Sequence, residues 1–295
     1  MMRWMAREFD FLDWIGRQQR DDARVPIPSG DDLAGLKWKA GDLLLIGADQ
    51  VADGVHFDSR VHTPHAIGAK AMNRNLSDCA AMGCLPAAAV ATVALPRRTS
   101  LDYAKELYRG MRWAGEKYGC KIVGGDTAVW SGPLILSLTI LGRSAGVAPV
   151  RRNGAKVGDW IYVTGSLGGS LLGRHMSFEP RLRLGRSLAR RNLASAMCDL
   201  SDGLSRDLRN ICRASGVGAI VESDRIPIHD DVMRLAGSPL GHAINDGEDY
   251  ELLFTSSRHV RGAVRIGRIV KQRGMWLEKE GRRQVMKPGG WEHGT

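Results

Sequence analysis

Hydrophobic positions along the chain follow two patterns, and each pattern predicts one type of element. Apolar residues three or four positions apart predict amphipathic helices, whereas short apolar or β-branched runs predict buried strands. The helical spacing covers residues 9–15 and 100–119, and we expect further helices at residues 65–82, 182–192 and 205–214. The short runs cover residues 43–46, 87–95, 121–123, 134–141, 160–164, 219–222 and 250–255. Strands and helices are therefore mixed along the whole chain, which predicts an α/β (α+β) fold.

The composition changes at residues 144–158, which are rich in Gly, Ala, Pro and Arg. Such segments often separate domains, and 295 residues suffice for two domains with separate cores. We therefore expect an N-terminal domain of residues 1–145 and a C-terminal α/β domain of residues 146–295. Leu-Ser-Asp occurs once in each half, ending at Asp78 and at Asp202. These matches are too short to establish a repeat, so a duplicated unit stays open.

The overall composition, with 43% hydrophobic and 25% charged residues, is that of a soluble globular protein. The longest mildly apolar run, residues 86–95, is too short to span a bilayer, so no membrane segment is expected. Arg3, Arg7 and Glu8 occupy the N-terminus without an apolar run beside them, which argues against a secretory signal and favours the cytoplasm. The five cysteines form no CxxC pair and are expected to be reduced core residues.

The formal net charge of +10 has two interpretations. It could serve a nucleic-acid partner, but the basic residues are scattered apart from a cluster at 181–191 that fits one helix face. No nucleic-acid-binding module accompanies the charge, so we expect no such partner. Attraction of small anionic substrates is the preferred interpretation.

Acidic residues stand beside glycine in several places, which indicates a metal site made of carboxylates. Hard cations such as Mg²⁺ are held by a few carboxylates together with substrate phosphates. A lone Gly-Asp pair is usually a turn, but acids that follow apolar strands lie at the sheet edges where ligands bind in α/β proteins. Besides the two Leu-Ser-Asp segments, the clusters occupy residues 30–32, 124–126 and 247–249.

Several features keep two interpretations at this point. Asp199 and Asp202 would share a face if a helix began there, or Ser201 or Asp202 would cap a helix from Leu204. His56 is a substrate contact or a core histidine rather than a zinc ligand, because no second ligand stands at a suitable spacing. The glycine-rich segment 165–169 is a phosphate loop or an ordinary turn. Neither a GxxxxGK[ST] loop nor a kinase HRD or DFG set is present.

Seven sequence blocks together resemble the thiamine-monophosphate kinase family, within the aminoimidazole ribonucleotide synthetase superfamily. The most specific are NLSD with AAMG, DLSDGL and GEDYELLFT. The resemblance implies two α/β domains per chain and a homodimer in which the N-terminal sheets join in a barrel, with ATP near the interface. The blocks lie at residues 30–32, 49–57, 70–86, 124–127, 157–168, 199–204 and 247–255.

The resemblance also implies roles for individual residues in the phosphorylation of thiamine monophosphate to thiamine diphosphate by ATP. It assigns no general base, because several Mg²⁺ ions and positioning carry a direct in-line transfer. It implies Mg²⁺ ligation by Asp31, Asp49, Asp78, Asp126, Asp199 and Asp202. It implies ATP contacts for Gly125, Asp126, Arg143 and Ser201, with Tyr108 as a further neighbour, and thiamine phosphate contacts for His56, Glu248 and Trp291.

The chain departs from the family pattern at Ala48, where a hydroxyl residue is usual, and at Asp53, where Glu is usual. These departures favour an alternative, a nucleotide-binding regulatory member with weak or no turnover, or a kinase or ligase for another phosphorylated small molecule. Two other branches of the superfamily are disfavoured, because they need a cysteine near the N-terminus or at the C-terminus. Here the first cysteine is Cys79 and the last is Cys212.

Overall fold

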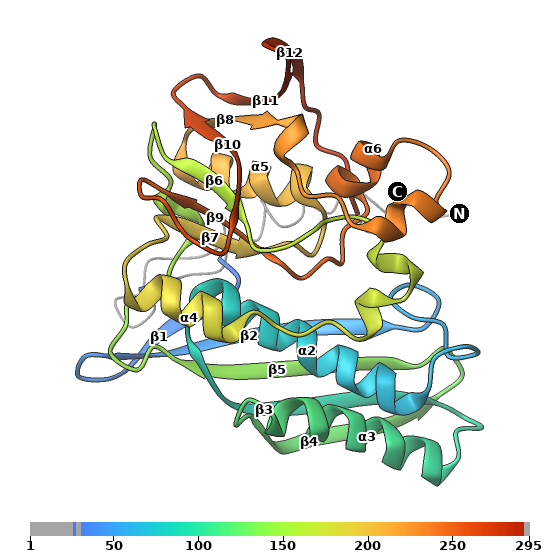
Figure 1. The fold of residues 1–295 in the computed structure, drawn as a ribbon. Coiled ribbons are helices and arrows are strands. Elements are labelled where there is room, and N and C mark those ends of the chain that lie inside the picture. The colour runs from blue at the N-terminus through green and yellow to red at the C-terminus, as the bar shows by residue number, and fades with distance from the viewer. Residues whose placement is uncertain (1–25, 28–30, 292–295) are drawn as a thin grey trace, which may run out of the picture.

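The computed structural model describes residues 26–27 and 31–291, which form two sheets with helices packed on them. The first sheet has the order β1-β2-β5-β3-β4, and α2 and α3 lie along one of its faces (Figure 1). Its strands are antiparallel except for the parallel pair β3 and β4. The elements are β1 (Ala34–Lys39), β2 (Asp42–Ala52), α2 (Pro64–Met82), β3 (Leu85–Pro96), α3 (Leu101–Glu116), β4 (Lys121–Trp130) and β5 (Ile135–Arg143).

Helix α2 occupies the centre of the molecule. The Thr63 side chain caps its first turn by accepting from the Ala66 amide, Pro64 stands in its first turn, and Gly83 ends it in the left-handed conformation. Most of its residues are buried, because it lies between the first sheet and elements of the second half. Since this helix is enclosed on several sides, its polar side chains must find partners inside the protein.

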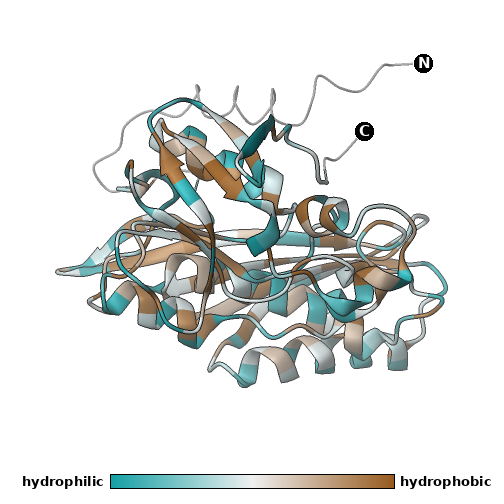
Figure 2. Ribbon diagram, turned by 45° about the horizontal axis from the view of Figure 1, so that its top comes forward, coloured by the Kyte–Doolittle hydropathy of each residue, from teal (hydrophilic) through white to brown (hydrophobic). Residues whose placement is uncertain are grey.

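The second sheet has seven strands in the order β12-β11-β8-β10-β6-β9-β7. Helix α5 packs within this half, whereas α4 reaches across and packs on α2 (Figure 1). Hydrophobic residues follow the strands, and hydrophilic residues gather in loops and on outer helix turns (Figure 2). The elements are β6 (Trp160–Val163), α4 (Leu182–Arg190), β7 (Ala196–Asp199), α5 (Leu204–Ser215), β8 (Gly218–Glu222), α6 (Pro239–Asn245), β9 (Leu252–Ser256), β10 (Val264–Val270), β11 (Gly274–Lys279) and β12 (Arg282–Val285), with 3₁₀ turns at Arg152–Gly154, Ser170–Leu172, Arg174–Met176, Ser223–Arg225 and Asp230–Arg234.

The predicted mixed α/β fold is confirmed, and so are the four main helices at 65–82, 100–119, 182–192 and 205–214, with ends shifted by a few residues. The prediction that a strand ends at residue 123 is wrong. Strand β4 continues through Gly124–Thr127 because it pairs with β3 as far as Trp130. Strands β1, β7, β10, β11 and β12 were not predicted from the pattern. The helical spacing at residues 9–15 and the residue Gly30 lie outside the described residues.

The five cysteines are buried and unpaired, as the sequence predicted. Among residues 26–27 and 31–291, no helix combines the length and apolar character that a bilayer crossing requires.

Candidate active site

Three carboxylates from distant parts of the chain meet between the two halves. Asp32 precedes β1, Asp78 lies in the last part of α2, and Asp199 is the last residue of β7. One oxygen of each lies within 4.8 Å of the others. Ser77 donates a hydrogen bond of 2.6 Å to Asp199 Oδ2 and so fixes that carboxylate beside α2. We call Asp32, Asp78 and Asp199 the carboxylate group.

Burial and mutual repulsion make this group unfavourable without a cation. Burial raises the pKa of Asp199 to about 7, with a further contribution from the charge of Asp32. Burial, together with the charges of Asp49 and Asp199, also raises the pKa of Asp78 well above its usual value. The Oδ2 atom of Asp32 is buried and has no hydrogen-bond partner among the described residues. A close set of oxygen donors with an unsatisfied atom fits a hard divalent cation such as Mg²⁺.

Asp31 and Asp32 have different surroundings although they are adjacent. Asp31 accepts from Arg151 Nε at 2.9 Å and from the Arg152 amide at 2.7 Å. Asp32 instead faces Arg152, whose Nη2 lies 3.0 Å from Oδ1. The structure thus brings Asp32, rather than the predicted Asp31, into the carboxylate group, and it adds the guanidinium of Arg152 beside it.

A second polar group adjoins the first along α2. Arg74 bonds Asp49 through Nε at 3.1 Å and Glu248 through Nη1 at 3.4 Å. Since Arg74 and Asp78 are four residues apart on the helix, they share a face. Lys70, one turn earlier, donates to Glu248 at 2.7 Å. Glu248 is thereby linked to Asp49, so a predicted substrate residue and a predicted metal ligand adjoin Asp78 in one polar region.

The loop between β7 and α5 joins these groups through its backbone. The Glu248 amide donates to the carbonyl of Ser201 at 2.7 Å, and the Trp291 amide donates to the carbonyl of Asp202 at 3.1 Å. Asp202 donates through its own amide to Asp207, a buried carboxylate. The predicted residues Ser201 and Asp202 of this loop therefore lie beside Glu248 and the start of α5. The predicted residue Trp291 is joined to the same loop through its backbone.

The two predicted conformations of this loop are both wrong. Asp199 and Asp202 do not share a helix face, because Asp199 ends a strand and α5 begins only at Leu204. Neither Ser201 nor Asp202 caps the helix, since the cap position is Gly203 without a side-chain bond. Gly203 has a φ of 105°, and a side chain there would meet the backbone of Asn245. A turn through glycine therefore replaces the expected cap.

The glycine-rich turn after β6 binds acids of its own chain. The Gly168 amide donates to both carboxylate oxygens of Asp249, at 3.0 and 3.1 Å, and the Gly169 amide donates to Asp246 at 3.1 Å. These amides already have anionic acceptors. The interpretation as a structural turn is thus favoured over a phosphate loop.

Other predicted nucleotide residues lie apart from the carboxylate group. Asp126, Gly125 and Tyr108 line a cavity of about 540 Å³ between α3 and the strands β3 and β4. The pairing register aligns Asp126 with Thr92, Ser137 and Gln50 across the sheet. Three strand spacings, about 14 Å, therefore separate Asp126 from the strand that carries Asp49.

Arg143 lies far from Asp49 along the first sheet. It is exposed at the end of β5, five residues beyond Leu138, the register partner of Asp49. At the rise of an extended strand this is about 17 Å along the sheet. The structure does not bring Arg143 together with the acids, whereas Arg152 lies among them.

Glu248 opens onto a cavity of about 380 Å³. Phe178 and Tyr250 line it and stack with their ring centroids 3.9 Å apart. His56 lies near the same region, because its carbonyl accepts from Lys70, and its Nδ1 accepts from the Ala52 amide at 3.2 Å. A cavity with an aromatic wall and a carboxylate at one side suits an organic cation or an amine donor.

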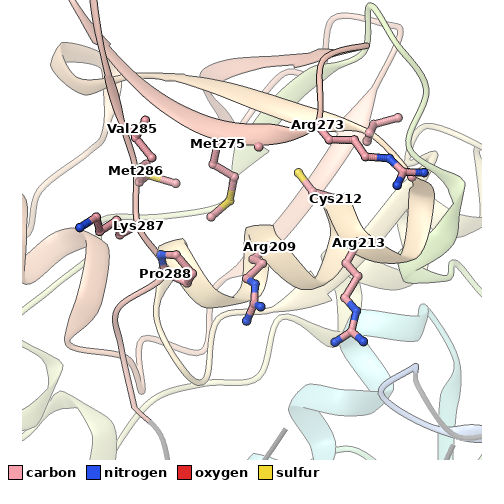
Figure 3. A pocket seen from close by; sticks show the side chains of 12 residues that line it. Arg209, Cys212, Arg213, Arg273, Met275, Val285, Met286, Lys287 and Pro288 are labelled. Atoms are coloured by element: carbon pink, nitrogen blue, oxygen red, sulfur yellow. The ribbon is translucent and has the colours of Figure 1, made fainter. Parts of the chain in front are cut away.

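A different cavity, of about 470 Å³, lies at the other end of α5 (Figure 3). Cys212, Met275 and Met286 form its apolar floor, and basic side chains such as Arg273 stand around it. None of the predicted site residues lines this cavity. The polar region at the start of α5 is therefore the candidate active site.

The residue patterns had missed six polar members of the site. Lys70, Arg74 and the predicted Asp78 follow one another at intervals of four on α2, a spacing that is visible in the sequence. Asp32 belongs to the acidic cluster at residues 30–32, although its neighbour Asp31 was predicted as the ligand. Nothing in the local sequence distinguishes the other three, which reach the site only through the fold. The missed residues are Asp32, Lys70, Arg74, Arg152, His175 and Asp207.

Family models match both halves of the chain. The model for the AIR synthase related protein, N-terminal domain, matches residues 30–144, and the model for the C-terminal domain matches residues 172–275. The thiamine-monophosphate kinase of Rhodopirellula baltica is 37% identical, with 97% of each chain covered. That of Bacillus subtilis is 31% identical, with 85% of this chain and 83% of the relative covered.

Solved structures agree with these matches. A structure described as AaThiL complexed with AMPPCP and TMP superposes with a TM-score of 0.86 at 29% identity, covering 99% of this chain and 100% of that one. A HypE-HypF complex superposes with a TM-score of 0.75 at 18% identity, covering 94% of this chain and 99% of that chain, and supports the fold alone.

Proposed function

The chain belongs to the thiamine-monophosphate kinase family, and on that basis we propose that it transfers a phosphoryl group from ATP to thiamine monophosphate. The products are thiamine diphosphate and ADP. The observation that carries the proposal is the carboxylate group on α2 and β7, held next to Glu248 and its aromatic cavity. A site for cations thus adjoins a site for an organic acceptor.

The transfer brings two polyanions together, so their repulsion has to be offset. Mg²⁺ ions held by Asp32, Asp78 and Asp199 would supply this positive charge. The remaining predicted ligands, Asp31, Asp49, Asp126 and Asp202, stay proposals for further metal contacts. Arg152 adds a fixed guanidinium beside Asp32, where it would bind a phosphate oxygen.

No residue has to act as a general base, because the acceptor phosphate has a second pKa of about 6 and is largely ionised at neutral pH. We therefore propose direct in-line transfer, in which positioning and charge stabilisation carry the reaction. Trapping a phosphorylated form of the protein during turnover would contradict this mechanism.

We also propose a homodimer formed through the first sheet. Its edge strand β4 exposes Val123 by 66%, Val129 by 64% and Trp130 by 38%. An exposed apolar edge strand favours pairing with a second chain. The separation of Asp126 from the carboxylate group within one chain supports a site to which the second copy contributes Asp126, Gly125 and Tyr108. Location in the cytoplasm remains a prediction.

The second candidate function is nucleotide binding with weak or no turnover, favoured by Ala48 and Asp53. Asp53 still has a structural partner, since it accepts from the Ser59 amide at 2.9 Å and from the Ser59 hydroxyl. The shorter acid thus supports the loop before α2. The Asp53 departure therefore has a structural role and lends the regulatory alternative little support.

The decisive experiment measures product formation by the purified protein with ATP, Mg²⁺ and thiamine monophosphate. Parallel reactions contain unphosphorylated thiamine or lack the metal. Thiamine diphosphate formed only with the monophosphate and the metal supports the proposal. ATP binding without product would instead support the regulatory alternative or another acceptor.

A further inference from the structure

Lys70 is a charged residue at the centre of the protein, with a side chain that is 0% exposed. Its Nζ lies 2.5 Å from the His56 carbonyl oxygen, 2.6 Å from His175 Nδ1 and 2.7 Å from Glu248 Oε2. An ammonium group has three donors. All three are therefore used, and the three acceptors come from segments far apart in the sequence.

A buried position is unfavourable for a charged ammonium group, so the contacts of Lys70 must offset the cost of burying its charge. Burial lowers the pKa of Lys70 to about 8, although Glu248 opposes this effect. Buried ion pairs can often be replaced by apolar residues of similar size without loss of stability. The contacts of Lys70 instead converge on His56 and Glu248, two of the three residues proposed to meet thiamine monophosphate.

The hydrogen bonds around Glu248 can be counted atom by atom. Oε1 receives Arg74 at 3.4 Å and the Tyr250 hydroxyl at 3.2 Å. Oε2 receives Lys70 and lies 2.9 Å from His175 Nδ1. When Nδ1 accepts from Lys70, its lone pair is occupied and it cannot donate to Glu248. One acceptor position of Oε2 then stays available, because each carboxylate oxygen accepts two bonds.

We propose that Lys70 is a positioning residue for the acceptor substrate. It fixes the His56 segment and the Glu248 carboxylate relative to each other, and it occupies His175 Nδ1 so that Glu248 Oε2 can accept from the substrate. The aminopyrimidine of thiamine monophosphate carries a suitable N–H donor. This inference rests on the proposed function, and it assigns to Lys70 orientation of the acceptor rather than binding of ATP.

The test is a double-mutant cycle of Lys70→Met and Glu248→Gln, read by steady-state kinetics. Lys70→Met is expected to raise KM for thiamine monophosphate about tenfold, while KM for ATP stays within about twofold. In the Glu248→Gln background, Lys70→Met should add less than about twofold, because it acts through the missing carboxylate. Equal changes in both KM values, or additive effects, would overturn the proposal.

The control is Lys105→Met, which removes an exposed lysine of α3 that pairs with Asp102. Both KM values should be unchanged. If Lys70→Met does not fold, as thermal unfolding would reveal, His175 provides a second route. His175→Gln can still accept from Lys70 and should keep KM within about threefold, whereas His175→Leu should raise it about tenfold. Equal behaviour of the two His175 variants would contradict the role of Lys70.

Failure of the proposed function can be separated from failure of this inference. If wild-type protein forms no thiamine diphosphate, calorimetric binding of thiamine monophosphate replaces KM. About tenfold weaker binding by Lys70→Met, with the Glu248→Gln dependence described above, would then support positioning without turnover. Absence of binding by the wild-type protein would overturn both proposals.

Discussion

At the scale of single residues, the site contains two kinds of acid. The carboxylate group is destabilised when it ionises, whereas Glu248 is stabilised as an anion. Asp199 is buried, with Asp32 and Asp78 half-buried beside it, so that two of them cannot ionise without strong repulsion. Glu248, in the adjoining polar group, is instead surrounded by the cations Lys70 and Arg74 and by the Tyr250 hydroxyl donor. The carboxylate group therefore favours folding only when protons or a cation are bound, whereas Glu248 is stable as an anion.

Removing one acid of the carboxylate group should therefore separate stability from activity. We expect Asp199→Asn to lower kcat/KM by about 100-fold or more. In metal-free buffer the same change should raise the melting temperature by ~2–4 °C, because it relieves repulsion. It should also reduce the stabilisation by Mg²⁺. Differential scanning fluorimetry with and without Mg²⁺ checks both, with Asp102→Asn, 92% exposed in α3, as the control. An unchanged Mg²⁺ response would contradict the metal assignment.

The charge of Glu248 should appear in the acid stability of the protein. Burial would raise its pKa, but the close approach of the His175 ring and the charges and hydrogen bonds of Lys70 and Arg74 outweigh this and lower the pKa to about 2, from 4.5. Its stabilising contribution, about 3 kcal/mol at most, is complete above pH 4.5 and is lost as the pH falls towards 2. Urea unfolding between pH 2.5 and 7 should therefore show a shallower acid dependence for Glu248→Gln. Parallel curves would argue against a preformed anion.

Sequence patterns predicted the chemistry of the residues better than their identity. Asp78 and Asp199 were predicted as ligands and lie in the carboxylate group, but Asp32 occupies the place expected for Asp31. Asp31 pairs with Arg151 and Asp32 with Arg152, and a doublet of acids does not reveal which of the two faces the site. His175 and Arg152 come from turns, and only the tertiary fold brings them to α2.

At the scale of elements, the position of α2 depends on two glycines. A Cβ at Gly68 of α2 would lie 2.0 Å from the Leu107 carbonyl oxygen of α3, and one at Gly110 of α3 would lie 1.9 Å from the His65 carbonyl oxygen. The two helix backbones thus touch without side chains between them. This close approach holds α2 at the depth at which its polar face reaches the second half.

Gly110→Ala should separate these helices. Alanine favours a helix by about 1 kcal/mol over glycine, but the clash with backbone should exceed this, and we expect a net loss of about 2 kcal/mol. Chemical denaturation measures the change. Gly241→Ala in α6 is the matched control, because a Cβ there meets only Ser238 at ordinary contact distance. Its stability should be equal or higher, and similar losses for both variants would contradict the role of the close contact.

Element predictions succeeded where one face of a segment is apolar. They failed where a strand forms only because a neighbouring strand pairs with it. Helix α3 shows the 3.6-residue pattern, with Leu107, Met111 and Ala114 buried on one face, so its existence followed from sequence. Strand β4 contains Gly124 and Gly125, which have weak strand propensity, and it persists because β3 supplies its hydrogen bonds. Strand β12 is fully exposed and follows a tight turn from β11, so it has no hydrophobic pattern to detect.

At the scale of the whole molecule, the proposed second copy would complete the site. Asp78 and Asp126 belong to one family pattern but lie on distant parts of one chain. A dimer in which each site takes Asp126 from the other subunit resolves this separation. The open edge of β4 would supply the surface for that contact.

Mixing two inactive variants tests this arrangement. Asp78→Asn and Asp126→Asn should each be inactive alone, but dissociated and reassociated in equal amounts they should recover about a quarter of wild-type activity, since half of the dimers are mixed and each of those has one intact site. Size-exclusion chromatography with light scattering confirms the dimer. Absence of recovery in confirmed mixed dimers would show that each chain supplies both aspartates to its own site.

Because α2 is one unbroken helix, it also fixes the distance between the residues along it. Lys70 and Asp78 are eight residues apart on it, which at 1.5 Å per residue separates them by about 12 Å. An acceptor oriented at the Lys70 end must therefore extend far enough to place its phosphate at the Asp78 end. Unphosphorylated thiamine would lie correctly at Glu248 and still stop short of the acids. The separation of Lys70 and Asp78 along the helix would then explain why the monophosphate, rather than thiamine, is the acceptor.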